Sequence, residues 1–495
     1  MQPCIVGSRS STTPRIWWRA SGSPGAAPPA TRAHVTAFRA ALLLAVTLGL
    51  LPARAEAIPA FARKYATSCM TCHTVFPKLN AHGEAFRLRG YRMPDQMEED
   101  VAQPPVSMGA PAYKRLWPHA VWPGAIPSSV PLAINVKLAV VNTSSLNDDG
   151  TVSKVKNDFQ FPQEVNLFGA GTLGDHISAF SELTFGVASD NSVETEVEHA
   201  HIGFDSPFGR EDLFHFRIGK FTPNVADVFQ EMFITTDAGI DTLFNYNPIG
   251  LHGGVGLGAD EVTPNPISFP ALVQGIEAYG IVRHRLMYVA GVCNGISAGD
   301  GQFGNNSKDL YGRLDYKIGG LGLDGDTGGK EASDKNWRDD SLRVGAFAYR
   351  GRAAGVNFPV QDELGTAFNL QDRHFLRTGF FASAYLRDLN VFGAYLRGSD
   401  TLDQLDPADG TPLGQIAPDF HAWFVQADYV FYPWLVGTAR YETLTPADGS
   451  VPSVRVGTAN VSGLVRANVK AMLEYQRDLR EGSNYSLDAV LRFAF

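Results

Sequence analysis

From about residue 131 onward, hydrophobic and polar residues alternate in segments of about ten residues, broken by clusters of Gly, Asn, Asp and Pro. In an extended strand, this alternation places apolar side chains on one face and polar side chains on the other. The last segment is the clearest, because from Tyr485 to Phe495 the odd positions hold Tyr, Leu, Ala, Leu, Phe and Phe, whereas the even ones include Ser, Asp and Arg. The pattern predicts strands with one lipid-compatible face.

Repeated along the chain, the pattern predicts about sixteen antiparallel strands, an even number as bacterial single-chain barrels prefer. They cover roughly 131–142, 163–173, 176–188, 194–204, 212–221, 272–282, 284–294, 308–318, 341–351, 374–386, 389–398, 419–431, 433–443, 453–464, 467–478 and 485–495. Short turns are expected at Gly174-Asp175, Arg283, Asp388, Pro433 and Arg466-Ala467, and long loops at 143–162, 222–271, 295–307, 352–373 and 399–418. The long segment 319–340 breaks this alternation, because it falls on the short-turn side.

These features predict an all-β transmembrane barrel in the bacterial outer membrane, in contact with lipid and with both barrel ends on the periplasmic side. The composition agrees, with 50 Gly, 31 Phe, 16 Tyr and only 19% charged residues. No apolar run after residue 57 approaches the roughly 20 residues of a membrane helix. The terminal Phe495 also resembles the last strand of outer-membrane proteins, which barrel assembly machinery reads.

The N-terminal residues predict export. An apolar run from Ala40 to Leu51 follows Arg32 and Arg39 and precedes Ala55-Glu56-Ala57, the pattern of a cleaved secretory signal. We therefore expect a leader and signal peptide over 1–57, a monohaem cytochrome segment over 58–110, a linker over 111–130 and the barrel over 131–495. Loss of six Arg and one Glu with the leader, from 42 basic and 51 acidic residues, leaves a net charge of −14, which argues against nucleic acid as a partner.

The predicted cytochrome segment contains Cys69-Met70-Thr71-Cys72-His73, the C-x-x-C-H pattern of covalent haem c attachment. Two thiols at this spacing reach the two vinyl groups of one porphyrin, and the adjacent His73 then becomes the proximal iron ligand. A thioredoxin-like pair would need a βαβ setting, and a zinc site would need a further Cys or His pair nearby. Neither setting is present. The lone Cys293 is expected to be a small apolar residue of the barrel wall.

The sixth iron ligand is left open by the sequence. Met93 is our first choice, His82, Met97 and Met108 are also within reach, and the iron could keep an open or solvent position. Helical spacing predicts that Phe76, Leu79 and Phe86 share one apolar stripe. A segment this short seldom folds alone, so we expect it to dock on the rest of the chain, at the periplasmic mouth or inside the barrel.

Two polar clusters invite a metal-site interpretation. In the stretch from Glu194 to His201, strand geometry puts the three Glu on one face and the two His on the other, so a shared set of metal ligands is not expected. In the long loops, Asp148-Asp149, Asp403, Asp406 and Asp409 are expected to be solvated charges, although they could attract cations. No Ser-His-Asp order, phosphate-binding Gly loop or paired-carboxylate catalytic site stands out.

The segment resembles the fused monohaem cytochrome c–porin family of outer-membrane Fe(II) oxidases. The resemblance is close over Ile58-Pro59-Ala60-Phe61-Ala62-Arg63, Ser68 to His73, Phe76-Pro77-Lys78-Leu79, Gly83, Phe86 and Gly90-Tyr91, and for the barrel it is one of architecture only. It implies one haem held at Cys69, Cys72 and His73, which accepts electrons from extracellular Fe(II) and passes them to a periplasmic cytochrome.

The leading interpretation is therefore outer-membrane electron transfer by an Fe(II):cytochrome c oxidoreductase, without a general base. Three alternatives remain open at this point: electron export to an extracellular acceptor, a solute porin gated by a redox-sensing cytochrome segment, and a soluble periplasmic β-protein with haem. Pore conductance and Fe(II)-driven haem reduction distinguish Fe(II) oxidation, electron export and the gated porin. Cell fractionation tests the soluble periplasmic protein.

Overall fold

The computed structural model describes residues 60–93, 106–107, 115–116, 118–119, 125–126, 131–144, 156–173, 176–187, 192–209, 212–226, 231–240, 272–294, 308–329, 333–351, 357–361, 367–406, 408, 410–417, 419–447, 453–479 and 485–495. The predicted leader, the turn at Gly174-Asp175, Met97 and Met108 lie outside these residues. None of the helices within the described ranges has the length and hydrophobicity needed to cross a membrane.

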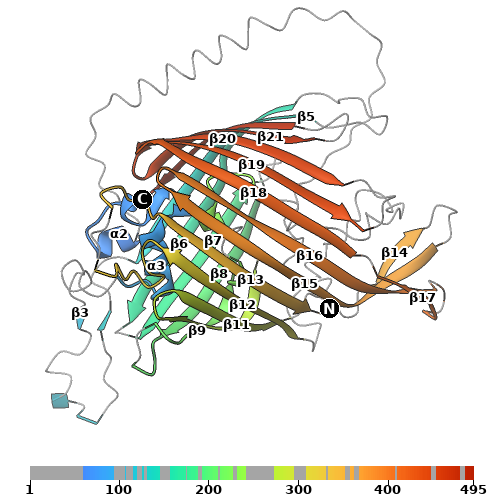
Figure 1. Ribbon diagram of the computed structural model, residues 1–495, viewed down its shortest axis with the longest axis horizontal. Coiled ribbons are helices and arrows are strands. Elements are labelled where there is room, and N and C mark those ends of the chain that lie inside the picture. The colour runs from blue at the N-terminus through green and yellow to red at the C-terminus, as the bar shows by residue number, and fades with distance from the viewer. Residues whose placement is uncertain are drawn as a thin grey trace, which may run out of the picture. The chain divides into compact units, whose positions relative to one another are not determined.

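The described strands close into an antiparallel barrel (Figure 1). Eighteen strands take part, and without the two short outer strands β14 (Asn357–Gln361) and β17 (Pro412–Ile416) the wall has sixteen, as predicted. They are β5 (Leu132–Ser144), β6 (Lys156–Leu173), β7 (Ile177–Val187), β8 (Val193–Asp205), β9 (His215–Phe221), β10 (Val273–Val282), β11 (Leu286–Asn294), β12 (Lys308–Gly319), β13 (Ser341–Gly351), β15 (Ala367–Leu386), β16 (Leu389–Leu405), β18 (Asp419–Tyr432), β19 (Leu435–Pro446), β20 (Val454–Arg466), β21 (Val469–Asp478) and β22 (Tyr485–Ala494).

The observed strands extend beyond their predicted boundaries mainly at the end of the barrel where long loops are predicted. There β6 begins at Lys156, seven residues early, and β15 and β16 continue into hairpins with β14 and β17. The predicted loops 352–373 and 399–418 are therefore partly sheet. These extensions contain Asn, Asp, Gln and Pro, which are typical of loops, so the sequence does not mark them as strands even though Phe159 and Phe161 are exposed on one face of β6.

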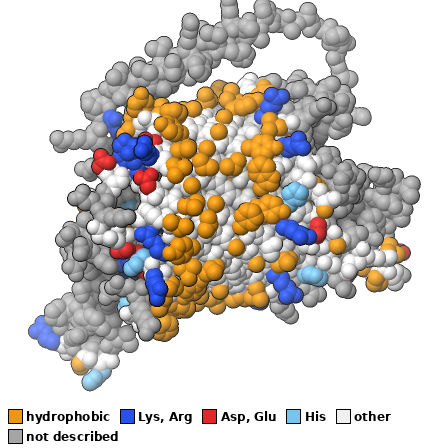
Figure 2. Space-filling view, in the orientation of Figure 1, with side chains coloured by type: hydrophobic (Ala, Val, Ile, Leu, Met, Phe, Trp, Pro, Cys, Tyr) orange, Lys and Arg blue, Asp and Glu red, His pale blue; other side chains and the backbone are white. Residues whose placement is uncertain are grey.

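The wall is apolar outside and polar inside. Figure 2 shows hydrophobic side chains in a band across the barrel, with Lys, Arg, Asp, Glu and His at its two edges. Phe380 is 59% exposed on the outer face, whereas the inward Glu442 and Gln426 are fully buried. In β22, Leu487 and Phe495 are exposed and Arg492 is buried, which confirms the predicted lipid face of the last strand. The arrangement is that of an outer-membrane-type barrel.

The first strand of the barrel begins, and the last strand ends, at the same rim. β22 pairs with β5, and Phe495 and Ile134 exchange two backbone hydrogen bonds of 2.8 and 2.9 Å. The tight connections at Arg283, Asp388 and Pro433 lie at this same end of their strands, which we call the turn rim, and the opposite end is the loop rim. The predicted shared location of the two ends is thus confirmed, and the periplasmic side of the turn rim stays a prediction.

The N-terminal residues 60–93, called here the motif segment, pack against the barrel at the turn rim. They form α2 (Ala60–Lys64), the 3₁₀ turn η1 (Cys69–Thr71), the hairpin β1 (His73–Val75) and β2 (Lys78–Leu79), and α3 (Ala81–Leu88). The predicted helical stripe of Phe76, Leu79 and Phe86 is wrong, because only Phe86 is helical. Pro77 lacks an amide donor and disfavours helix at Phe76, so the chain makes a hairpin there instead.

A second segment fills the lumen from the other side. Residues 222–226 and 231–240 follow β9 and include η3 (Glu231–Phe233), and we call these described residues the inward segment. Asn224 bonds Glu277 of β10 through both its backbone and side chain, at 2.8 and 2.7 Å. Thirteen residues later, Asp237 pairs with Lys137 of β5 and Arg492 of β22, at 2.7 and 3.2 Å. The sequence predicts only a long loop over 222–271, yet the described residues of its first part contact inward-facing side chains of strands β10, β5 and β22.

Candidate functional site

The C-x-x-C-H motif is packed tightly under helix α3. The Ser68 hydroxyl accepts a hydrogen bond from the amide of Met70 and caps the short η1 turn, which begins with Cys69 and has Cys72 as its C-cap. The Cys72 carbonyl accepts one from the Asn80 amide at 3.0 Å. A Cβ at Gly83 of α3 would stand 2.1 Å from that carbonyl oxygen, so only glycine permits this approach. Cys69 and Cys72 are both unpaired thiols.

His73 has the ring orientation of a metal ligand. Its Nδ1 lies 2.9 Å from the carbonyl oxygen of Pro77, an atom that can only accept, so Nδ1 carries the ring proton. The lone pair is then on Nε2, and a backbone carbonyl at the other nitrogen is the usual partner that orients a ligating imidazole. Burial lowers the pKa of His73 to about 4, which keeps the ring neutral.

The two thiols are unlike those of a redox pair. Burial raises the pKa of Cys72 to about 12, with a further contribution from Cys69, whose own pKa burial also raises. Catalytic thiols of the thioredoxin type have lowered pKa values instead. Cys72 packs against an apolar cluster of the motif segment, whose other members are Phe61, Tyr65, Phe86, Tyr91 and Met93. Thiols, a neutral imidazole and this apolar surface fit a covalently held haem.

The structure brings together the two described candidates for the sixth ligand. His82 Nε2 lies 3.4 Å from Met93 Sδ, and Met93 is buried beside Tyr65 and Phe86. Burial lowers the pKa of His82 as well, so the imidazole is available as a neutral donor. Both side chains therefore remain candidates, and Met93 stays our first choice as a prediction.

The long connection between β12 and β13 at the turn rim supports the motif. Asn336 donates from Nδ2 to the carbonyls of Met70 and His73, at 2.6 and 3.1 Å. The neighbouring Trp337 packs on the cluster around Val75 and donates to Asp388, which also forms a two-bond ion pair with Arg338. This explains why the turn-rim connection over 319–340 is long: its second half anchors the attachment motif.

We expect Asn336→Ala to loosen the attachment motif without affecting the barrel. The change removes one hydrogen-bond donor from each of two carbonyls of the motif, and each lost bond of this kind costs about 0.5–1.5 kcal/mol. Hydrogen exchange should therefore accelerate at residues 69–73. Asn468→Ala is a matched control, since Asn468 donates a hydrogen bond to the carbonyl of Ala494, a barrel residue at the same rim. Equal exchange in both variants would contradict the anchoring role.

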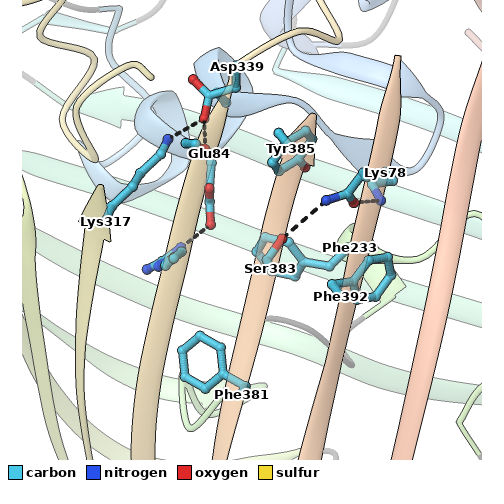
Figure 3. A pocket seen from close by; sticks show the side chains of 13 residues that line it. Lys78, Glu84, Phe233, Lys317, Asp339, Phe381, Ser383, Tyr385 and Phe392 are labelled. Atoms are coloured by element: carbon cyan, nitrogen blue, oxygen red, sulfur yellow. Dashed lines mark hydrogen bonds and ion pairs between the residues drawn. The ribbon is translucent and has the colours of Figure 1, made fainter. Parts of the chain in front are cut away.

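Ion pairs and hydrogen bonds join the motif segment to strands around the barrel (Figure 3). Lys78, 3% exposed, bonds Asn390 of β16 at 2.6 Å and pairs with Asp428 of β18. Glu84 pairs with Arg343 of β13. Arg92 pairs with Asp205 at the end of β8, and Arg89 pairs with Asp212 in the connection that follows. Arg87 donates a hydrogen bond to Asn224 of the inward segment. In three of these contacts a basic side chain of the segment meets a carboxylate of the barrel, and in the Glu84–Arg343 pair the charges are reversed.

Rings connect the motif segment to the barrel wall. Tyr91 stacks on Phe61 at 5.0 Å between ring centroids, and on Phe180 of β7 at 5.8 Å. Phe180 in turn meets His199 of β8 edge-on at 5.7 Å. Burial raises the pKa of Tyr91, and a nearby Glu182 carboxylate adds to the increase. A continuous line of contacts therefore runs from the apolar cluster beside Cys72 to the inner face of β8.

The expectation for the Glu194–His201 stretch is wrong at one position. The pairing of β7 with β8 skips a residue, so that Glu182 faces His199 and Leu183 faces Val197, with Glu198 as the extra residue of a β-bulge. The bulge cancels the alternation there. The ligand atoms of Glu182, Glu198 and His199 lie within 4.8 Å of one another. No bulge signal is visible in the sequence, because the strand contains neither Gly nor Pro between Val193 and His201.

The remaining candidates have ordinary roles in the parts that the structure describes. Cys293 is buried in the wall and contacts the Tyr349 hydroxyl at 3.3 Å, as expected of a small buried residue. Asp403 accepts a hydrogen bond from Gln415 in the β16–β17 hairpin, and Asp406 one from the Ala408 amide. Asp148, Asp149 and Asp409 lie outside the described residues.

Comparisons with known proteins yield distant structural likeness only. No protein-family model matches the chain. No curated protein matches it either. Among solved structures, OmpT from the outer membrane of Vibrio cholerae is 12% identical, with 74% of this chain and 98% of that chain covered and a TM-score of 0.44. The outer-membrane channel DcaP of Acinetobacter baumannii is 12% identical, with 79% and 100% covered and a TM-score of 0.46.

An anion-selective porin from Comamonas acidovorans is 10% identical, with 74% of this chain and 99% of that chain covered and a TM-score of 0.43. Likeness this distant does not say what the present chain binds or transports. The fold is established by its own strand pairing: a porin-like, sixteen-stranded antiparallel barrel of the outer-membrane type with a short N-terminal helical segment.

Proposed function

We propose that this protein transfers electrons across the bacterial outer membrane, from extracellular Fe(II) to a periplasmic cytochrome, by means of one haem c. The observation that carries the proposal is the C-x-x-C-H motif, which the barrel holds at its turn rim with the His73 ring oriented by Pro77. Cys69 and Cys72 would hold the haem through thioethers, His73 would ligate its iron, and Met93 is the proposed sixth ligand. A haem bound there supplies a one-electron acceptor and donor.

The residues of this chain contribute positioning and exclusion of water. The Asn336 amide and the α3 helix hold the motif, and the Lys78–Asp428 pair fastens it to the wall. The motif segment and the inward segment fill part of the lumen together, since the Arg87 guanidinium lies over the Phe233 ring at 5.5 Å. Such a filled interior favours electron transfer over the passage of solutes. The proposal places the turn rim in the periplasm, where an electron-accepting cytochrome can approach it.

To test this, the purified, oxidised, full-length protein is mixed with Fe(II) under anaerobic conditions in a stopped-flow instrument. The haem absorption bands are recorded over time. We expect conversion to the reduced spectrum to the same extent that dithionite gives. A protein that another donor reduces rapidly, but that Fe(II) leaves oxidised, would overturn the choice of iron as the donor.

A solute porin with a redox-sensing segment is the second candidate, because the wall has the size of solute-conducting barrels. Planar-bilayer recordings separate the two functions. The electron-transfer proposal expects small conductance that does not change with haem redox state. A large conductance that switches on reduction would favour the gated porin.

A further inference from the structure

We infer that Glu182, Glu198 and His199 form a divalent-cation site inside the barrel, and that this site takes up Fe(II) on its way to the motif segment. The inference rests on the proposed function for the identity of the cation. The argument for the site itself does not depend on that function. The β7–β8 bulge brings the ligand atoms of all three side chains within 4.8 Å of one another.

The geometry suits a metal of ordinary coordination. His199 Nδ1 and Glu182 Oε2 lie 2.9 Å apart. Two ligand atoms at right angles around a metal about 2.1 Å away are separated by about 3 Å. The ligand atom of Glu198 lies within 4.8 Å of the other two, so a closer approach of its carboxylate would complete one face of an octahedron. An imidazole with two carboxylates is a donor set suited to Fe(II), Mn(II) and Zn(II).

His199 is held by a partner that suits ligation. Its Nε2 lies 3.1 Å from the Thr222 hydroxyl at the start of the inward segment. Without a cation, Nδ1 donates its proton to Glu182, and the hydroxyl donates to Nε2. When a cation takes Nδ1, the ring proton moves to Nε2 and donates to the hydroxyl, which can accept as well as donate. The change of tautomer keeps the hydrogen bond between His199 and Thr222 and releases no net proton.

The electrostatic setting favours a cation. The His199 side chain is 16% exposed and that of Glu182 11%, so the site is shielded yet still reachable. The basic residues on the neighbouring β9 are engaged elsewhere, since Arg217 pairs with Glu277 at 2.9 Å and Lys220 with Glu196 at 2.9 Å. Two carboxylates therefore meet a cation without a competing charge from these two side chains.

The position of the site suits electron transfer. His199 contacts Phe180, Phe180 stacks on Tyr91, and Tyr91 belongs to the apolar cluster against which Cys72 packs. Fe(II) bound at the site would lose one electron to become Fe(III), and the acceptor is the haem of the proposed function. Because electronic coupling falls steeply across empty space, an unbroken line of packed rings supports that single-electron step.

The test measures metal binding and haem reduction separately, on the full-length protein under anaerobic conditions. Mn(II) is titrated into the protein, and its binding is measured as loss of the electron paramagnetic resonance signal of the free ion. We expect one binding site, from which Fe(II) displaces Mn(II). Glu182→Gln and His199→Gln should each weaken this binding at least tenfold. Glu194→Gln, which removes a carboxylate charge from β8 outside the cluster, should leave the binding unchanged.

The outcomes distinguish the two proposals. Absence of Mn(II) and Fe(II) binding, or equal weakening by Glu194→Gln, would overturn the site even where Fe(II) reduces the haem. Tight binding that Glu182→Gln weakens, in a protein whose haem Fe(II) cannot reduce, would leave the site in place and reject iron oxidation. Heat-modifiable electrophoretic mobility of each variant confirms that the barrel is folded.

Discussion

Replacing both Cys69 and Cys72 with serine is expected to remove all covalently bound haem and all Fe(II)-driven change in absorption, while the barrel still folds. Serine has nearly the size of cysteine but no sulfur with which to form a thioether. The ion pairs that fasten the motif segment to the wall involve neither thiol, so the docked arrangement should persist. Intact mass of the denatured protein and peroxidase staining of haem after electrophoresis measure the loss.

Cys293→Ser is the matched control. That thiol is buried in the wall beside Tyr349, in a different cluster from the motif, and its replacement should keep the haem mass and the Fe(II) response. Full haem content in the double variant of Cys69 and Cys72 would contradict the attachment site. A loss of haem in Cys293→Ser, with the barrel intact, would mean that attachment depends on more than the C-x-x-C-H motif.

Lys78→Met is expected to release the motif segment from the barrel wall. It leaves the Asp428 carboxylate, 4% exposed, without its cation, and breaking a buried ion pair from one side costs about 3–5 kcal/mol. Asp428 also accepts hydrogen bonds from Thr235 of the inward segment and from Thr438, so the disturbance should reach both segments that fill the lumen. Limited proteolysis should cut residues 60–93 faster, and the midpoint of urea unfolding should fall.

Two further variants locate the effect. The double variant Lys78→Met with Asp428→Asn removes both charges and should regain part of the lost stability, because no buried charge is then left alone. Arg397→Gln breaks the exposed pair with Asp419 and should cost only about 0–1 kcal/mol. If Lys78→Met behaves like Arg397→Gln, the pair does not fasten the segment.

The sequence predicts those parts of the fold that depend on the local environment of each residue. A residue of β22 faces lipid or lumen according to its parity, so the alternation from Tyr485 to Phe495 is visible without a structure. The C-x-x-C-H motif, on which the haem proposal rests, is equally local because its five residues are contiguous. Position, order and number of the wall strands follow from such signals.

The parts that the sequence does not predict depend on contacts between distant segments. The bulge at Glu198 exists because β7 and β8 pair with a one-residue offset, and this offset leaves no mark in the sequence of β8. The inward segment depends on Arg440 and Glu474, which lie about 200 residues further along the chain. One signal was present: the long connection over 319–340 interrupted the alternation of turns and loops, and it contains the residue that anchors the motif.

The close packing of the motif under α3 has a consequence for the order of biogenesis. Cys69 is 8% exposed, and the missing side chain of Gly83 lets the helix lie directly on the Cys72 carbonyl. An enzyme that attaches haem to these thiols needs access to both of them, and the docked α3 helix covers the backbone between them. The proposed haem attachment therefore requires that the thiols react before α3 packs on the motif.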